Sequence, residues 1–198
     1  MKQRSNEWFN ARRGRITASR IGDVLANPNT KRYNNYQEDI IDEIMGVPDF
    51  NDTDKPWYQH GKDWEPEARD LYEWETGVKV KEVGIEVHPY YDFISCSPDG
   101  EIGSSGGLEI KCHRSLVEHK TSIRVGIPSK HKPQVQSSLW ITGRKWWDFV
   151  SFYKNTSIGK RDIHIYRVIP DSKYIERIEK ACLKFWDEIK EELNEIRS

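Results

Sequence analysis

The sequence predicts an α/β protein in which a central mixed β-sheet is flanked by α-helices. Two observations support this fold class. Apolar residues recur at helical spacing up to Thr76 and again after Ser172, whereas between Val78 and Ile169 many of them alternate with a period of two. The 198 residues contain no repeat, low-complexity tract or Gly/Ser linker, so we expect a single domain over residues 1–198 with a sizeable core.

The helices expected before the sheet have recognisable ends. They are a short helix between Ser5 and Gly14, a second one opened by Thr17-Ala18-Ser19, a third over Tyr33–Met45 and a fourth over Trp57–Thr76. Ser5 is a favourable N-cap residue, and Pro66 must either start the fourth helix or kink it. Residues 47–56 are rich in turn formers and predict an exposed loop.

The strands and later helices follow from the change of period. Strands are expected over Val78–Val87 with an interruption at Gly84, over Phe93–Ser95, Gly107–Lys111, Trp146–Tyr153 and Ile163–Ile169. A helix is expected over Lys132–Ile141, and a long amphipathic helix over Ser172–Arg197. Residues 113–128 are basic with scattered apolar positions, and the pattern there is ambiguous between helix and loop.

Composition and charge exclude several classes of protein. With 31 basic and 32 acidic residues the net charge is −1, which argues against a general nucleic-acid coating protein but not against an enzyme with a local basic channel. No apolar run approaches the roughly 20 residues of a membrane span, so no membrane partner is expected. The N-terminus leads into no apolar signal core, and three cysteines without Cys-x-x-Cys spacing fit reduced thiols in the cytoplasm.

The most informative pattern is Ser97-Pro98-Asp99-Gly100 followed by Glu109-Ile110-Lys111. A Pro-Asp-Gly turn commonly ends one strand and starts another, and on a strand Glu109 and Lys111 project from the same face. If the two strands pair as a hairpin, Asp99 returns beside Glu109. Two carboxylates can then share a divalent cation, with an ammonium group close to the water that the cation binds. This is the pattern of the PD-(D/E)XK nuclease superfamily, although a turn followed by a solvated strand would read the same way.

Four segments in order make the interpretation specific. They are Arg12-Arg13-Gly14-Arg15-Ile16-Thr17-Ala18-Ser19, the Gly61 to Gly77 block with Glu65-Pro66-x-Ala68-Arg69, Cys96–Gly100 with Leu108–Cys112, and Gln134-Val135-Gln136-x2-Leu139-Trp140. Together they resemble the YqaJ-type viral recombinases, the phage lambda exonuclease family of the PD-(D/E)XK superfamily. The resemblance runs from about Trp8 to Tyr153 and implies a restriction-endonuclease-like core. It departs at His113, where the lambda enzyme has a proline, and at Arg15, where that enzyme has an apolar residue.

The resemblance implies a Mg²⁺-dependent exonuclease that degrades one strand of linear duplex DNA from a 5′-phosphorylated end and leaves a 3′ single strand for annealing. Mn²⁺ would substitute for Mg²⁺, with two ions per site. It also implies a homotrimer around DNA, a phage single-strand-annealing protein as partner, and a phage or prophage gene expressed in the bacterial cytoplasm.

The resemblance also assigns roles to individual residues. The implied metal ligands are Asp99, Glu109, the carbonyl of Ile110 and Glu65, while Lys111 orients or activates the attacking water and Gln134 reaches toward the nucleophile. Arg12, Ser19 and Ser97 correspond to the positions that hold the 5′-phosphate; arginine grips phosphate in a fork, and Ser19 lies near an expected helix N-terminus.

Each assignment has a structural alternative. Glu65 could be an ordinary helix-start glutamate, Ser19 a helix residue, Arg12 a surface arginine and Gln134 an exposed side chain. All six histidines lack metal-ligand spacing and are interpreted as non-catalytic, and Trp140, Trp146 and Trp147 as core or interface. A basic set could contact the DNA backbone or form a solvated face: Lys120, Arg124, Lys130 and Lys132.

Two other functions stay open at this point. An endonuclease of the same superfamily would cut closed circular DNA, but it leaves the Arg12–Ser19 segment unexplained. A non-catalytic module that binds DNA ends should have lost an acid or the lysine, yet Asp99, Glu109 and Lys111 are all present.

Overall fold

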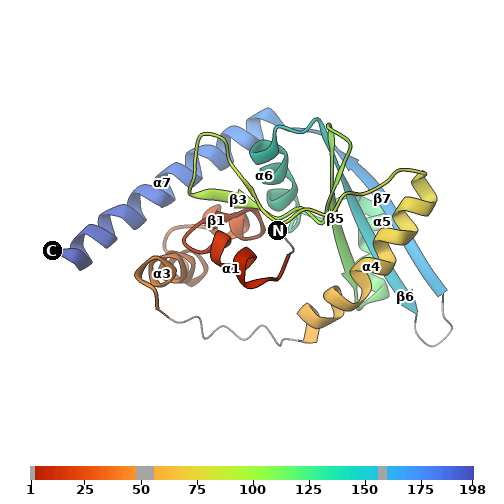
Figure 1. Ribbon diagram of the computed structural model, residues 1–198, viewed down its shortest axis with the longest axis horizontal. Helices are drawn as coiled ribbons and strands as arrows, with labels where there is room; N and C mark the ends of the chain where they lie inside the picture. The colour runs from red at the N-terminus through yellow and green to blue at the C-terminus, as the bar shows by residue number, and fades with distance from the viewer. Residues whose placement is uncertain (1–2, 48–55, 156–159) are drawn as a thin grey trace.

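The computed structural model describes residues 3–47, 56–155 and 160–198. Its helices are α1 (Asn6–Arg12), the 3-10 turn η1 (Ala18–Arg20), α2 (Ile21–Val24), α3 (Lys31–Met45), α4 (Pro56–Thr76), α5 (Leu116–Val125), α6 (Lys132–Thr142) and α7 (Ser172–Arg197). Its strands are β1 (Ile16–Thr17), β2 (Glu86–Val87), β3 (Ile94–Cys96), β4 (Gly100–Ile102), β5 (Gly106–His113), β6 (Trp146–Asn155) and β7 (Lys160–Val168). The expected α/β class, with mixed sheets flanked by helices, is confirmed (Figure 1).

The strands form two sheets rather than one central sheet. The smaller one has the order β1-β3-β2, with β1 and β3 parallel. The larger one has the order β4-β5-β6-β7, with β5 and β6 parallel and the other pairs antiparallel. β3 ends at Cys96 and β4 begins at Gly100, so the Pro-Asp-Gly turn is the junction between the two sheets.

Helix α4 packs against one face of the larger sheet, and α5 and α6 contact the other (Figure 1). On the α4 face, Ala68 and Tyr72 pack with Leu108, Ile110 and other buried apolar residues. On the opposite face, Val135 and Leu139 of α6 pack with three residues of β6 and β7: Trp147, Phe149 and Val168. Because alternate residues of β5 face these two layers, the strand has one apolar side and one polar side.

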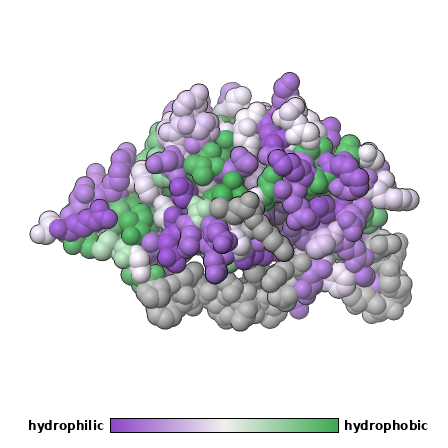
Figure 2. Space-filling model, in the orientation of Figure 1, coloured by the Kyte–Doolittle hydropathy of each residue, from purple (hydrophilic) through white to green (hydrophobic). Residues whose placement is uncertain are grey.

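The long helix α7 encloses the third part of the core. Its buried positions are Ile178, Cys182, Phe185, Ile189 and Leu193, which match the expected stripe closely. They pack with α2, α3 and the smaller sheet. Hydrophilic side chains cover most of the face seen in Figure 2, with hydrophobic ones along the side of α7 near α3. Among the described residues, no helix is both long enough and apolar enough to cross a bilayer.

Several local predictions hold. Ser5 caps α1 by accepting from the Trp8 amide, and α3 ends at Gly46 in the left-handed conformation with φ 75°. The strand predicted from Phe93 is displaced by one residue. The ambiguous residues 113–128 contain α5. All three cysteines are free thiols, as expected for a reduced protein.

Other local predictions are wrong or untested. The helix expected after Thr17 is only a 3-10 turn followed by a single turn of α-helix. The fourth helix is confirmed to within one residue as α4, but Pro66 lies inside it, so the alternative that Pro66 starts this helix is wrong. The loop expected at 47–56 falls almost entirely outside the described residues.

The strand expected over Val78–Val87 forms only at its last two residues. Before them, Lys81 makes a single bridge to Glu101, with the two backbone hydrogen bonds at 2.8 and 2.9 Å. Strand β4 is three residues long, so it offers too little length for a continuous ladder. Val80 packs in the core beside Gly100 instead, where a Cβ would meet the Val80 side chain at 2.1 Å.

Candidate active site

The hairpin of β4 and β5 brings Asp99 and Glu109 together. Gly100 pairs with Leu108 in an antiparallel register, which, continued by one residue, sets Asp99 opposite Glu109. The Asp99 amide donates to the Leu108 carbonyl at 3.1 Å. The geometry that the sequence pattern requires is therefore present.

The edge of β5 beyond Leu108 faces Asp99 instead of another strand. The Ile110 amide donates to Oδ2 of Asp99 at 2.6 Å. The Asp99 side chain thus takes the place of the backbone carbonyl that a longer β4 would have supplied. The N–H and C=O groups of one strand residue point to the same side of the strand. The Ile110 carbonyl therefore also points toward the side on which Asp99 lies.

The charges in this region repel one another. Burial, the nearby Glu109 carboxylate and the Glu65 carboxylate together raise the pKa of Asp99 well above its usual value, and Lys111 and the Ile110 amide only partly oppose this. A group of carboxylates that resists ionisation is an arrangement that a cation relieves.

Lys111 and Gln134 both bind one oxygen of Glu109. The Lys111 Nζ lies 2.5 Å from Oε1 of Glu109, and the Gln134 Nε2 donates to the same oxygen at 2.7 Å. Glu109 itself is only 2% exposed. Burial disfavours the charged form of Lys111, but the surrounding acids outweigh it and raise its pKa. Lys111 is therefore an ammonium group at neutral pH and acts as a donor.

Glu65 projects from α4 and is held by two arginines. Arg4 Nη2 lies 2.8 Å from Oε2 of Glu65, and Arg69 Nη2 lies 2.8 Å from Oε1. Among the described residues, no three His, Cys, Asp or Glu side chains are arranged to hold a metal ion as they stand. Glu65 thus belongs to the electrostatic environment of Asp99 without being turned toward it as a third ligand.

The donor set nevertheless suits a hard divalent cation. Asp99 and Glu109 supply carboxylate oxygens, the Ile110 carbonyl points to the same side, and Glu65 lies close enough to raise the pKa of Asp99. Oxygen-only ligand sets of this kind fit Mg²⁺ or Mn²⁺. The residues expected to hold a metal are compatible with that role, which remains a prediction.

Arg12 and Ser97 are joined directly. Arg12 Nη1 donates to the Ser97 hydroxyl at 2.9 Å, and its guanidinium lies 4.3 Å from the centre of the Trp8 ring. The Trp8 indole N–H donates to the same hydroxyl at 3.1 Å and to the Gly84 carbonyl. Two donors therefore fix the hydroxyl of Ser97, which precedes Asp99 by two residues, and the Trp8 ring and this hydroxyl together hold the Arg12 guanidinium.

Ser19 follows the strand that pairs with β3. Thr17 pairs with Ser95 in the parallel ladder of β1 and β3, so Ser19 and Ser97 follow at equivalent positions. The Ser19 and Thr17 hydroxyls are 3.3 Å apart. Ser19 is exposed and sits in a 3-10 turn of three residues, not at the start of the longer helix that we expected. Its predicted role with phosphate is untested.

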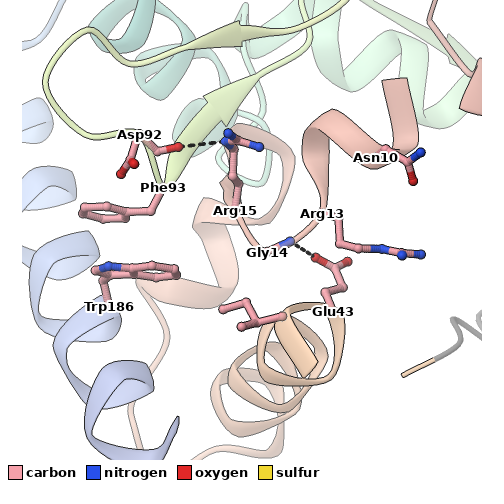
Figure 3. Close-up of a pocket in the computed structure, with 9 residues that line it drawn as sticks. Asn10, Arg13, Gly14, Arg15, Glu43, Asp92, Phe93 and Trp186 are labelled. Atoms are coloured by element: carbon pink, nitrogen blue, oxygen red, sulfur yellow. Dashed lines mark hydrogen bonds between the residues drawn. The ribbon is translucent and has the colours of Figure 1, made fainter. Parts of the chain in front are cut away.

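The turn between α1 and β1 is fixed on its other side. The Gly14 amide donates to Glu43 at 2.7 Å, and Arg15 donates to the Asp92 carbonyl at 2.7 Å (Figure 3). These residues line an open pocket of about 470 Å³ with the stacked rings of Phe93 and Trp186. The lining includes Arg13 but not Arg12, so the two neighbouring arginines serve different surfaces.

Other singled-out residues have structural surroundings. Trp147 is fully buried, and Trp140 and Trp146 pack against core clusters, as expected. In the basic set, Lys130 pairs with Glu118 and Lys132 with Asp171. Burial and the charge of Lys111 lower the pKa of His131 to about 3, so this histidine stays neutral.

Sequence reasoning missed the residues that surround the site. Trp8 lies at the start of the region of resemblance and Arg69 within its second segment. Arg69 follows Glu65 at helical i,i+4 spacing, which is a usable signal for an ion pair. Nothing in the sequence places Arg4 or Gln3 near α4 and the Asp99 turn. Gln3 donates to the carbonyls of Pro98 and Val83 at 2.6 and 3.0 Å.

The chain is similar to a known domain family and to several solved structures. The model of the YqaJ-like viral recombinase domain matches residues 7–145. The solved alkaline exonuclease LHK-Exo from Laribacter hongkongensis is 33% identical with a TM-score of 0.85, over 98% of this chain and 96% of that one. LHK-Exo in complex with dAMP gives 32% identity and a TM-score of 0.83 over the same shares.

A more distant structure shares the fold alone. A phage-related exonuclease from Haemophilus somnus 129PT is 14% identical with a TM-score of 0.65, over 90% of this chain and 96% of that one. A search of curated proteins finds no match.

Proposed function

Because the chain belongs to the family of YqaJ-like viral recombinase domains, we propose that it is a Mg²⁺-dependent 5′→3′ exonuclease acting on linear duplex DNA. It would start at a 5′-phosphorylated end and leave a 3′ single strand for annealing. The observation that carries the proposal is the cluster of Asp99, Glu109 and Lys111 around the edge of β5, with Gln134 on the same Glu109 oxygen.

Each residue of the cluster has a role in phosphodiester hydrolysis. Asp99, Glu109, the Ile110 carbonyl and Glu65 would hold the cation. When bound, Mg²⁺ supplies a hydroxide nucleophile near neutral pH and neutralises charge on the phosphoryl oxygens. Lys111, which the acids keep protonated, would orient the nucleophile by donating a hydrogen bond. Gln134 holds Glu109 and would reach the nucleophile with its amide group.

The preference for a 5′ end would come from Arg12, Ser97 and Ser19. Arg12 and Ser97 are joined at 2.9 Å, and Ser97 precedes Asp99 by two residues. A terminal phosphate carries more charge than an internal one, so an arginine placed here favours ends. The similar LHK-Exo forms a complex with dAMP, which supports a nucleoside monophosphate as a ligand of this chain.

The pH dependence of the proposed reaction follows from the raised pKa of Asp99. The carboxyl group must lose its proton before it can hold a cation, so activity should rise with pH through the pKa of Asp99. The similar exonuclease is described as alkaline, which supports this direction.

Further parts of the proposal rest on the family. We infer that residues 1–198 act as one nuclease domain, that the protein assembles as a homotrimer around DNA, and that it works in the bacterial cytoplasm with a phage single-strand-annealing protein.

The test is digestion of end-labelled linear duplex with a 5′-phosphate or a 5′-hydroxyl, beside a covalently closed circle, in Mg²⁺. The proposal expects loss of the phosphorylated strand from its 5′ end, an intact circle, and no digestion by Lys111→Ala. Cutting of the circle would indicate an endonuclease of the same superfamily. No cleavage in either Mg²⁺ or Mn²⁺ would leave a module that binds DNA ends.

A further inference from the structure

The segment that precedes α1 is anchored across the candidate active site. Gln3 Nε2 donates to the Pro98 carbonyl at 2.6 Å, directly before Asp99, and to the Val83 carbonyl at 3.0 Å. Arg4 follows with φ 66°, a left-handed conformation that non-glycine residues seldom adopt. Ser5 then caps α1. Anchors on both sides of Arg4 therefore maintain its unfavourable backbone conformation.

This backbone conformation places the Arg4 side chain beside the Glu65 carboxylate. Arg4 Nη2 lies 2.8 Å from Oε2 of Glu65, while Arg69 occupies Oε1 at the same distance. Both oxygens of Glu65 are therefore in ion pairs. A cation that uses Glu65 as a ligand must compete with one of the two arginines.

The two arginines differ in how readily they can leave. Arg69 lies one turn further along α4, is 12% exposed and also pairs with Glu82. Arg4 is 29% exposed and comes from outside the helix. The more exposed Arg4 side chain can turn into solvent by a change of rotamer, whereas the Arg69 side chain is more deeply buried between two carboxylates. Arg4 is therefore the partner that a cation would displace.

We propose that Arg4 is a displaceable counterion of the nuclease site, which occupies Glu65 and gives it up when a divalent cation binds. This inference rests on the proposed metal-dependent function. It assigns a positioning role to a residue outside the four segments that mark the family. Arg4 lowers the affinity of the site for metal and, together with Arg69, compensates part of the charge that Glu65 adds to the cluster around Asp99.

The release of Arg4 also has a consequence for DNA. A guanidinium that leaves Glu65 beside the reacting centre carries a positive charge next to an anionic phosphodiester, which is a favourable new partner. Metal and DNA should therefore bind more tightly together than separately, and Arg4 should be responsible for part of this coupling.

The experiment is calorimetric titration of the full chain with Mn²⁺ in the absence of DNA. Arg4→Ala should bind Mn²⁺ about three- to tenfold more tightly than the wild type, because a partly exposed ion pair no longer competes. Arg4→Gln should change affinity in the same direction, and Arg4→Lys should fall between it and the wild type. If Arg4→Ala does not fold, the Mn²⁺ affinities of Arg4→Gln and Arg4→Lys test the inference instead.

The matched control is Lys79→Ala. Lys79, three residues beyond the end of α4, pairs with Glu73 of α4 at 2.5 Å and is 91% exposed, so the variant removes an equal positive charge from an α4 glutamate away from the site. Its affinity for Mn²⁺ should equal that of the wild type. Unchanged or weaker binding by Arg4→Ala, or equal tightening by Lys79→Ala, would overturn the inference. Absence of Mn²⁺ binding by the folded wild type would instead remove the proposed metal dependence, and the inference with it.

Discussion

The Nζ atom of Lys111 lies 2.5 Å from Oε1 of Glu109, two residues earlier on the same strand. The amide of Gln134 donates to that oxygen from the opposite layer at 2.7 Å. Glu109 is almost fully buried, so these two donors compensate a charge that water cannot reach. One oxygen of Glu109 is thereby fixed in position by a cation and an amide together.

Replacement of Lys111 should separate chemistry from stability. Lys111→Ala should reduce hydrolysis by about 10²–10⁴-fold and destabilise the fold by about 1–3 kcal/mol, because Glu109 loses its ammonium partner. Lys111→Arg keeps the charge and should retain most of the stability but little of the activity. Digestion rates and urea unfolding of the same preparations provide the measurement; a fully active Lys111→Ala would contradict the proposed role.

Gln134 and Gln136 form a matched pair on α6. Gln134→Ala removes a donor from Glu109 and should lower activity by about 10–100-fold with a small effect on stability. Gln136 instead donates to the Ile169 carbonyl and accepts from the Asp171 amide, in the segment just before α7. Gln136→Ala should therefore lower the free energy of unfolding by about 1–3 kcal/mol and leave the rate of the folded fraction unchanged. The opposite assignment of effects would exclude Gln134 from the site.

Asp99 should destabilise the protein at neutral pH. Its pKa is raised in the folded state by burial, Glu109 and Glu65, so the folded protein binds its proton more tightly than the unfolded chain does. Stability is therefore lost as the pH rises from the usual aspartate pKa to the raised one. At neutral pH and in the presence of a chelator, Asp99→Asn should therefore raise the melting temperature, by about 2–4 °C for each kcal/mol added to the free energy of unfolding. In acid, where Asp99 is protonated, the same substitution should not change the melting temperature. The exposed Asp92→Asn is the control; equal melting temperatures for Asp99→Asn and wild type at both pH values would refute the argument.

Arg12 and Arg13 should differ in their effect on end preference. Arg12 binds Ser97 beside the Asp99 turn, whereas Arg13 lines the pocket together with Gly14 and Arg15 (Figure 3). Arg12→Ala should abolish the preference for 5′-phosphorylated over 5′-hydroxyl ends, a change of about tenfold or more for one charge-assisted contact. Arg13→Ala should keep it. The ratio of the two digestion rates measures the preference, and loss in both variants would show that the charge of α1 alone is responsible.

Gly107 is required for the approach of β6 to β5. A Cβ at this position would lie 2.3 Å from the ring of Trp147, which is fully buried. Gly107→Ala should destabilise the protein by about 1–3 kcal/mol and also reduce activity, because Glu109 follows two residues later. Gly61→Ala is the comparison, since nothing lies within 4 Å of the added atom and the position is helical. Chemical denaturation should show that Gly61→Ala is neutral or stabilising.

The success of the sequence prediction depended on how local each contact is. Asp99 and Glu109 could be placed together because a single turn and a short hairpin determine their register. The long helix α7 could be predicted because its stripe repeats over many turns. By contrast, Val78–Val87 has a strand-like pattern but lacks a partner strand of sufficient length, and pairing depends on the partner as much as on the pattern.

The surroundings of the site could not be predicted for a similar reason. Arg4 meets Glu65 across 61 positions of sequence, and Gln3 meets Pro98 across 95. Such contacts depend on the final placement of α1 and α4, and no periodicity encodes it. The division into two sheets likewise follows from where β3 stops relative to β4, which is decided by packing on both sides of the turn.

The alternation of side chains along strand β5 limits the mutations that this protein can tolerate. Alternate residues of the strand supply the core through Leu108 and Ile110, and the chemistry through Glu109 and Lys111. A one-residue insertion or deletion in the strand would exchange the two sets, turning both charges into the apolar layer and two aliphatic side chains toward Gln134. Such a change would give an unfolded chain rather than a slower enzyme. Natural variation in β5 is therefore restricted to substitutions, and catalytic activity and the ability to fold must be inherited together.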